Sequence, residues 1–168
     1  MALITLNPTS NTTPDPGQGG VAVTGNTNTG HSTTTSSASS GTAQTKTCVW
    51  QSFPATAGQV SSVTLKVTHT SSGILSGPSP SNQFLLQYSL NGGGAWTTAV
   101  SRVNFTASQG PTTFSVALGV GQDLTQVRVR DLIDAETILG ADTSVCVATI
   151  SGISIEIVTV DATVIAMM

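Results

Sequence analysis

The sequence predicts an all-β protein, an antiparallel β-sandwich of about seven to nine strands with an extended N-terminal arm. Apolar and polar residues alternate with a period of two in several short runs, and this spacing places one apolar row on one face of a strand. Clusters of Gly, Pro and Asn separate the runs at regular spacing. Short, evenly spaced strands with such turns between them are typical of a sandwich.

The clearest element is a β-hairpin predicted over residues 84–100, FLLQYSLNGGGAWTTAV. Phe84 and Tyr88 belong to one alternating apolar row. Asn91 and the glycines that follow it tolerate the positive φ that tight hairpin turns require. We therefore expect the chain to reverse at Asn91 and to continue antiparallel from Trp96 onward.

The segment before this body has a different composition. Residues 2–6, ALITL, could add to a sheet as a strand, whereas Asn, Thr, Ser, Gly and Pro dominate residues 7–46. A segment without apolar periodicity cannot bury enough surface to fold alone. We expect residues 1–46 to form an extended arm that lies against a neighbouring subunit or partner, and packing of the arm on its own body is the less favoured alternative.

Seven strand-like runs make up the predicted body, residues 47–158. They cover residues 47–53, 60–70, 84–90, 96–106, 112–118, 124–132 and 143–158, and Gly152 indicates a bulge in the last of them. Residues 71–82 are predicted to be a loop. Residues 131–142 fit one turn of helix or a plain loop, and residues 159–168 form an apolar tail that needs a partner strand.

Charge is the unusual feature of the composition. Only 8% of the 168 residues are charged, against roughly 25% in typical soluble domains. Such a surface suits dense packing in an assembly, and equally a small secreted domain rich in Ser and Thr. The net charge of −3 with five Lys and Arg residues gives no basic stripe, so binding to nucleic acid is not expected.

The first residues, MALITLNPTS, lack the features of a secretory signal, and no stretch reaches the length of a membrane span. We expect a protein made in the cytoplasm, or a mature fragment given a new Met. Cys48 and Cys146 could form a disulfide if the first and last strands are neighbours. Without an export signal, two buried thiols are the favoured interpretation.

No catalytic set is recognisable, and we expect no enzyme activity, no cofactor and no metal. The sequence has no HExxH, CxxC, GxSxG or Walker motif. His69 is expected on the wet face of a strand or at its rim. The acidic residues Asp131, Asp134, Glu136 and Asp142 could bind calcium if their loop curls, but they match no EF-hand spacing, so a solvated loop is favoured.

Ligand binding has weak candidates at the predicted hairpin. Tyr88, before the turn, and Trp96, after it, could form a small platform beside Asn91. Packing of both rings at the core or at a strand end is the favoured alternative. Aromatic residues are only 4% of the chain, so an extended aromatic binding face is not expected.

Two short motifs carry a resemblance to known families. SLNGGGAWT, residues 89–97, resembles the Ser-x-Asp-x-Gly-x-Thr-Trp hairpin of many bacterial and phage β-proteins, including the Asp-box of sialidases, with Asn91 in place of the Asp and Ala95 in place of the Thr. A single copy does not imply the sialidase propeller. ISGISIEI, residues 150–157, resembles the closing strand of jelly-roll carbohydrate-binding domains and phage virion accessory domains. The resemblance implies a jelly-roll-like sandwich.

Two functional hypotheses follow. The first is a structural component of a bacteriophage particle or similar assembly, such as a capsid decoration, head-fibre or tail protein, made in the host cytoplasm. Its partners would be other copies of itself or other virion proteins, through terminal contacts at Ala2, Leu3, Ile4, Leu6, Val164, Ile165 and Met167. The alternative is a carbohydrate-binding module of a surface or secreted protein that binds glycans through an exposed Trp96 or Tyr88.

Overall fold

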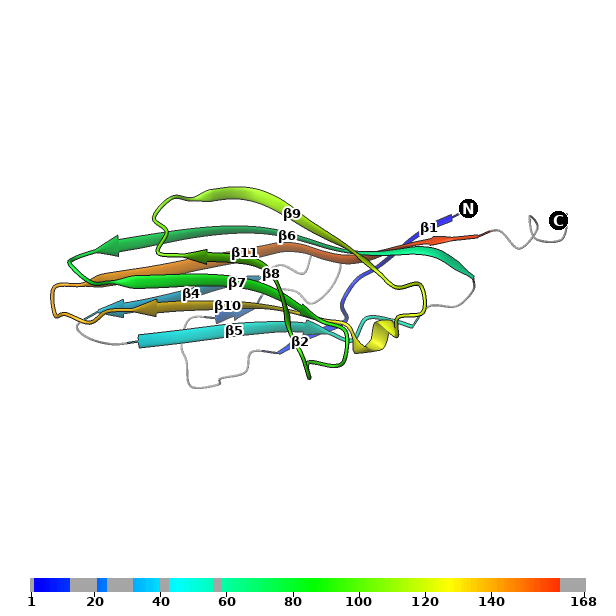
Figure 1. Ribbon diagram of the computed structural model, residues 1–168, viewed down its shortest axis with the longest axis horizontal. Coiled ribbons are helices and arrows are strands. Elements are labelled where there is room, and N and C mark those ends of the chain that lie inside the picture. The colour runs from blue at the N-terminus through cyan, green and yellow to red at the C-terminus, as the bar shows by residue number, and fades with distance from the viewer. Residues whose placement is uncertain (1, 13–20, 24–31, 40–42, 56–58, 161–168) are drawn as a thin grey trace, which may run out of the picture.

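The computed structural model describes residues 2–12, 21–23, 32–39, 43–55 and 59–160, and it consists of two antiparallel sheets packed face to face (Figure 1). Sheet A has the strand order β3-β4-β11-β6-β9, with β1 also paired to β11, and sheet B has the order β2-β5-β10-β7-β8. The predicted all-β antiparallel sandwich is confirmed.

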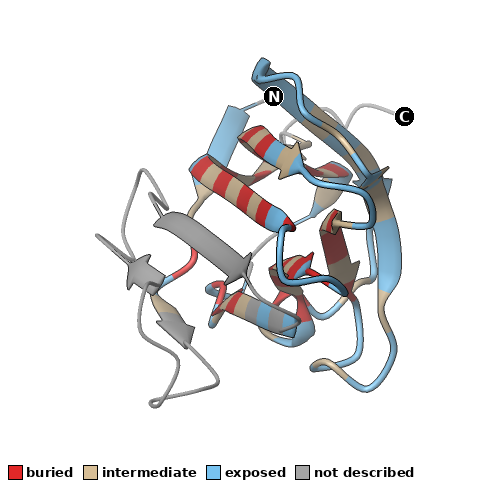
Figure 2. Cartoon of the chain, turned by 90° about the vertical axis from the view of Figure 1, so that its left-hand side faces the viewer, coloured by how far each residue is buried: buried red, intermediate tan, exposed pale blue. Residues whose placement is uncertain are grey.

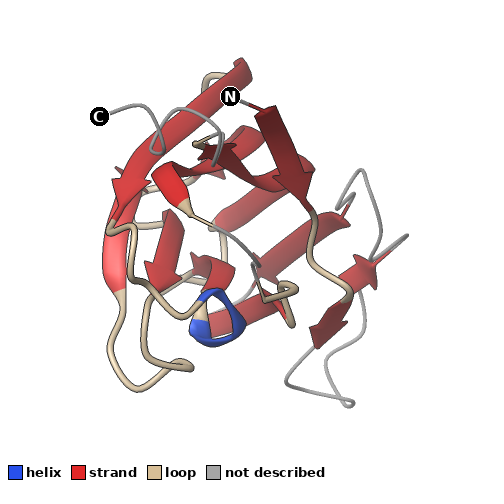
Figure 3. Ribbon diagram, turned by 90° about the vertical axis from the view of Figure 1, so that its right-hand side faces the viewer, coloured by secondary structure: helices blue, strands red, loops and turns tan. Residues whose placement is uncertain are grey.

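The described residues form eleven strands and one short 3-10 helix, η1, which Figure 3 shows as the single helical turn. The strands are β1 Ala2–Leu6, β2 Ser10–Thr12, β3 Val21–Val23, β4 Ser32–Ser39, β5 Ala43–Gln51, β6 Val60–Ser76, β7 Ser81–Ser89, β8 Thr97–Val103, β9 Gln109–Leu118, β10 Arg128–Glu136 and β11 Thr143–Thr159; η1 is Leu124–Gln126.

The eight strands from β4 to β11 pair in a nested order. The first, β4, lies beside the last, β11; β5 lies beside β10, β6 beside β9 and β7 beside β8, and each pair is antiparallel. A long hairpin folded over itself in this way is a jelly roll, which closes its sheets into a double layer. The jelly-roll topology expected from the motifs is therefore present.

Strands of the predicted N-terminal arm belong to these sheets. β1 pairs with β11 from Ala2↔Thr159 to Leu6↔Ile155, β4 pairs with β11, and β2 pairs with β5. The predicted boundary at residue 47 falls inside β5. Sheet pairing uses backbone groups, and threonine favours strands, so a Ser/Thr-rich segment can complete a jelly roll although its composition resembles that of a linker. Contact of this segment with a second subunit stays a prediction.

Two segments predicted as loops are partly strand, and only residues 77–80 and 137–142 of them are loop. β6 continues through the predicted loop at residues 71–82 as far as Ser76, because it stays paired with β11 up to Ser76↔Thr143. β10 continues to Glu136, where a helical turn or loop was expected. Its alternate residues Asp131, Ile133 and Ala135 are buried, so the strand period determines the conformation of this segment. The helical turn lies earlier, at η1, where the Asp123 carboxylate accepts a hydrogen bond from Thr125 N at 3.0 Å.

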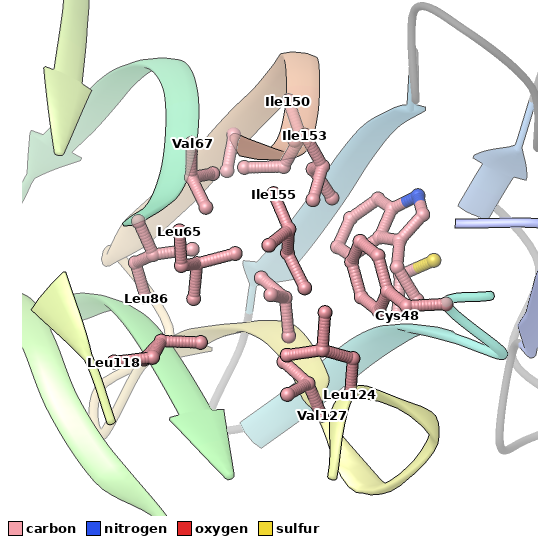
Figure 4. Packing of buried hydrophobic residues seen from close by; sticks show 14 of the residues in the cluster. Cys48, Leu65, Val67, Leu86, Leu118, Leu124, Val127, Ile150, Ile153 and Ile155 are labelled. Atoms are coloured by element: carbon pink, nitrogen blue, oxygen red, sulfur yellow. The ribbon is translucent and has the colours of Figure 1, made fainter. Parts of the chain in front are cut away.

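The core fills the space between the sheets. Figure 4 shows Leu65 of sheet A beside Leu86 of sheet B, with Ile155 pointing into the middle of the cluster. Figure 2, which looks along the strands, shows the buried residues concentrated between the layers. Strands β8 and β9, at the sheet edges, are largely exposed. Truncating one fully buried aliphatic side chain of such a core to Ala costs about 2–5 kcal/mol.

Both cysteines are buried free thiols, as favoured above, and the disulfide alternative is wrong. Burial raises the pKa of Cys146 to about 12, and the carboxylates of Asp131 and Asp134 add to this increase. The Cys146 Sγ–H donates to the carbonyl oxygen of Gln83 at 3.2 Å. A thiol with so high a pKa is a small apolar side chain and not a nucleophile.

The placement of His69 differs from the prediction. It is 1% exposed and lies on the inner face of β6, with its ring centroid 5.5 Å from that of Phe84. The period-two row of Val63, Leu65 and Val67 continues inward to His69, which is why a wet strand face was the wrong expectation. Neither ring nitrogen has a hydrogen-bond partner among the described residues.

Candidate functional site

The hairpin between β7 and β8 is held by side-chain hydrogen bonds. The Ser89 Oγ–H donates to Asn91 Oδ1 at 2.8 Å, and Ser89 Oγ accepts from Gly93 N at 3.0 Å. Asn91 Oδ1 also accepts from Ala95 N at 2.8 Å. Gly92 and Gly93 have φ values of 72° and 97°, which explains the glycines. The Asn91 side chain therefore fixes the turn, and the turn fixes the position of Trp96.

Trp96 lies on the outer face of sheet B, where its ring is partly exposed. The guanidinium carbon of Arg130 is 4.1 Å from the centroid of its ring. Arg130 Nε donates to Gln87 Oε1 at 2.7 Å, and Gln87 Nε2 donates to Thr98 Oγ1 at 3.0 Å. We call these four residues, Trp96, Arg130, Thr98 and the buried Gln87 that links the last two, the Trp96 surface.

Strand register explains why these side chains meet. Arg130 is the cross-strand partner of Gln87, and Gln87 is the partner of Thr98. Val129 and Asp131, on either side of Arg130, are buried, so Arg130 points outward. Cross-strand neighbours on one face are close enough for direct hydrogen bonds, and here they form a chain across three strands.

The Trp96 surface carries one positive charge. Burial lowers the pKa of Arg130, but a guanidinium stays protonated in proteins. It has no carboxylate partner among the described residues, and Nε–H is the only one of its five donors with a partner there. The surface therefore combines an aromatic ring with guanidinium N–H donors that have no partner in the described part of the chain.

Tyr88 and Trp96, the two rings of the weak platform candidate, lie on opposite faces of sheet B. Tyr88 packs against the core from the inner face, and its ring centroid is 6.0 Å from that of Phe114. Both rings are partly exposed and neither is buried. The structure therefore brings Asn91 and Trp96 together in the hairpin. The residue that contacts the Trp96 ring is Arg130, whereas Tyr88 packs against the core.

The predicted assembly residues fall into two groups. Ala2, Leu3, Ile4 and Leu6 form β1, in which Leu3 is 64% exposed and Ile4 is 39% exposed. Val164, Ile165 and Met167 lie outside the described residues. None of the described helical residues forms a stretch with the length and apolar character of a membrane span.

The acidic residues do not converge on a metal site. Asp131 is fully buried and accepts from Cys48 N at 2.9 Å, so a solvated loop is wrong for this residue. Asp134 accepts from Thr45 Oγ1, and Asp142 accepts from the backbone of Ser79 and Leu139. Within the described ranges, no three His, Cys, Asp or Glu side chains are placed to hold a metal ion.

Sequence reasoning missed Arg130, Gln87 and Thr98. The outward rows of β7 and β10 were readable from the period of two, and they contain Gln87 and Arg130. The register between β7 and β8 was not readable, because a shift at Leu86/Gln87 changes which residue of β8 faces Gln87.

Comparison with known proteins gives no family for the chain. No family model matches it, and no curated protein sequence matches it. Several solved structures are similar to the chain, and the three described next have low TM-scores. One is TmCBM61 in complex with β-1,4-galactotriose, with 12% identity, coverage of 74% of this chain and 68% of that chain, and a TM-score of 0.35.

The second is a CBM4 structure, with 10% identity, coverage of 93% of this chain and 94% of that chain, and a TM-score of 0.35. The third is the N-terminal cellulose-binding domain of Cellulomonas fimi β-1,4-glucanase C, with 11% identity, coverage of 95% and 90%, and a TM-score of 0.32. Similarity at this level carries no argument about function, which must come from the residues of this chain.

Proposed function

We propose that this chain is a non-enzymatic carbohydrate-binding module that holds a sugar ring against Trp96 on the outer face of sheet B. The observation that carries the proposal is the partly exposed Trp96 beside the Arg130–Gln87–Thr98 hydrogen-bond chain. An aromatic ring offers an apolar face to the C–H groups of a sugar, and the adjacent polar groups can bond to its hydroxyls.

Rigidity supports this use of the surface. The Ser89–Asn91 network holds the turn, and Arg130 holds the indole from β10. A preorganised site loses less conformational entropy when a ligand binds. With one aromatic ring and few polar contacts, we expect weak binding, with Kd on the order of 0.01–1 mM.

The test is a fluorescence and calorimetric titration with cellotriose, β-1,4-galactotriose, laminaritriose and mannotriose. Trp50 is fully buried, so a ligand-induced change in emission reports on Trp96. We expect binding of at least one trisaccharide, its loss in Trp96→Ala, and partial retention in Trp96→Phe. Tyr88→Phe is the control, because Tyr88 faces the core. A full glycan array without binding, or unchanged affinity in Trp96→Ala, contradicts the proposal.

A structural role in a bacteriophage particle or similar assembly is the second candidate. Leu3 and Ile4 on β1 favour it, since exposed apolar side chains on a short terminal strand suit contact with another subunit. Deleting residues 1–6 should then leave a folded protein that no longer associates with itself or its particle in sedimentation experiments. The glycan proposal implies a cell-surface or secreted location, and the assembly proposal a virion.

A further inference from the structure

A second surface lies on the outer face of sheet A, opposite the Trp96 surface. It is a groove of about 380 Å³, and its lining includes Thr5, Lys66, Thr68, Thr113, Gly152 and Ser154. This volume lies within the range of small-molecule sites, roughly 300–1,000 Å³. The groove has a polar, hydroxyl-rich lining at the place where β1 meets β11, the neighbouring strands seen in Figure 1.

The groove coincides with a gap in strand pairing. On the edge of β11 away from β6, β4 covers Thr143–Ile150 and β1 covers Ile155–Thr159. Among the described residues, residues 151–154 have no partner strand on this edge. A register shift between Ile150 and Gly152 interrupts the β6 pairing at the same place. A bulge facing an uncovered edge leaves the sheet surface hollow at this point.

Charges at the groove cancel. Lys66 Nζ is 2.7 Å from Glu156 Oε2, and the two side chains are 39% and 29% exposed. An anionic ligand near Lys66 would also meet Glu156, and a cationic ligand near Glu156 would meet Lys66. The charge pair therefore disfavours charged ligands of either sign.

Hydroxyl groups supply the remaining recognition chemistry. The Oγ1 atoms of Thr68 and Thr113 are 2.9 Å apart and form one hydrogen bond. Each hydroxyl has one donor and two acceptor sites, so this bond leaves one O–H and several lone pairs for a ligand. Alternating donors and acceptors without net charge match the hydroxyls of a sugar.

We propose that this groove is a second binding site, for a neutral polyhydroxylated ligand of the size of one or two sugar units. The inference goes beyond the Trp96 surface and stands on the groove alone. With sites on both outer faces, one molecule could bridge two glycan chains and gain avidity.

A substitution at Gly152, which lines the groove, gives the most direct test of the proposal. A Cβ at this position would lie 3.8 Å from Thr68 Cβ, which is ordinary contact. Gly152→Leu therefore fills the groove without a backbone clash. Gly140→Leu is the matched control, because a Cβ at Gly140 has no atom within 4 Å. Thr113→Val removes one hydroxyl and keeps the side-chain shape.

The experiment is a ¹⁵N NMR titration of the full chain with glucose, cellobiose and the four trisaccharides named above. We expect shifts at the amides of Thr68, Thr113 and Ser154, a loss of affinity of at least about tenfold in Gly152→Leu, and a smaller loss in Thr113→Val. Gly140→Leu and Trp96→Ala should leave the titration of the groove unchanged.

The outcomes separate the two sites. Shifts only around Trp96 overturn the groove proposal and leave the proposed function intact, whereas shifts only around Thr68 do the reverse. Unchanged groove affinity in Gly152→Leu overturns the groove proposal. Tighter binding of glucuronate or glucosamine than of glucose overturns the neutral ligand class.

Discussion

The side chain of Asn82 forms hydrogen bonds with both the backbone N–H and the backbone carbonyl of Phe105. Asn82 Oδ1 accepts from Phe105 N at 2.9 Å, and Asn82 Nδ2 donates to Phe105 O at 2.9 Å and to Val145 O at 3.1 Å. Asn82 is 2% exposed. It therefore connects β7 of sheet B, the segment after β8, and β11 of sheet A at one buried point.

Asn82→Asp is predicted to destabilise the protein by about 2–4 kcal/mol at pH 7, because a carboxylate cannot donate to the two carbonyls and is buried there. Urea denaturation measures the free energy of unfolding. The difference in the free energy of unfolding between the variant and wild type should be smaller at pH 4, where a protonated Asp regains one donor. A variant within about 0.5 kcal/mol of wild type would show that solvent replaces these bonds.

Gly73→Ala tests the same junction from sheet A. A Cβ at Gly73 would clash with the carbonyl oxygen of Phe105 and with Asn82 Nδ2, so we expect a loss of about 2–4 kcal/mol. Gly110→Ala, also in a strand of sheet A, is the control: no atom lies within 4 Å of its Cβ. Thermal unfolding should show a lower Tm for the first variant and an unchanged or slightly higher Tm for the second. Equal Tm values for the two variants would contradict this packing.

His69 is predicted to make the protein less stable in mild acid. Burial, and then the positive charge of Arg102, lowers its pKa in the folded state. The unfolded chain, with a His pKa of about 6.5, therefore binds more protons. The free energy of unfolding should be at its plateau above pH 6.5 and should fall below that pH, until the pH passes the lower pKa of the folded state.

The measurement is a series of urea denaturation curves between pH 5 and pH 8 for wild type and His69→Leu. Each unit of separation between the two pKa values corresponds to about 1.4 kcal/mol. The variant should lose this dependence, since Leu does not titrate, and it should not be strongly destabilised, because the ring nitrogens of His69 have no hydrogen-bond partner among the described residues. Identical pH profiles for the two proteins would show that another group controls acid stability.

The alternation of apolar and polar residues predicted those parts of the fold in which one face of a strand is buried. Phe84, Leu86 and Tyr88 do face inward, and the turn at Asn91 is where the chain reverses. The pattern was less informative where pairing partners decide the structure. β4 is almost entirely Ser and Thr and becomes a sheet strand through its backbone bonds to β11. His69 follows the inward row although its side chain is polar.

The candidate site was predictable only in part, for a similar reason. Trp96 and the turn that positions it are local in sequence. Arg130 is 34 residues from Trp96 in the chain, and their stacking depends on the register of β10 with β7 and on the irregular pairing of β7 with β8. The groove on sheet A depends on β1 and β11, which lie at opposite ends of the chain.

Glu156→Gln should separate stability from ligand charge at the groove. The Lys66–Glu156 pair is partly exposed, and exposed ion pairs contribute about 0–1 kcal/mol, so urea denaturation should show a change of at most about 1 kcal/mol.

The variant leaves Lys66 without its partner, and the groove then carries a net positive charge. Glucuronate should bind the variant more tightly than wild type, and the gain should decrease as salt is raised, because screening weakens the attraction. Lys66→Met removes the positive charge and leaves Glu156 without its partner. Glucuronate should therefore bind this variant more weakly than it binds wild type. Equal glucuronate affinity in wild type and both variants, measured by NMR titration at low salt, would show that the charge pair does not set the ligand preference of the groove.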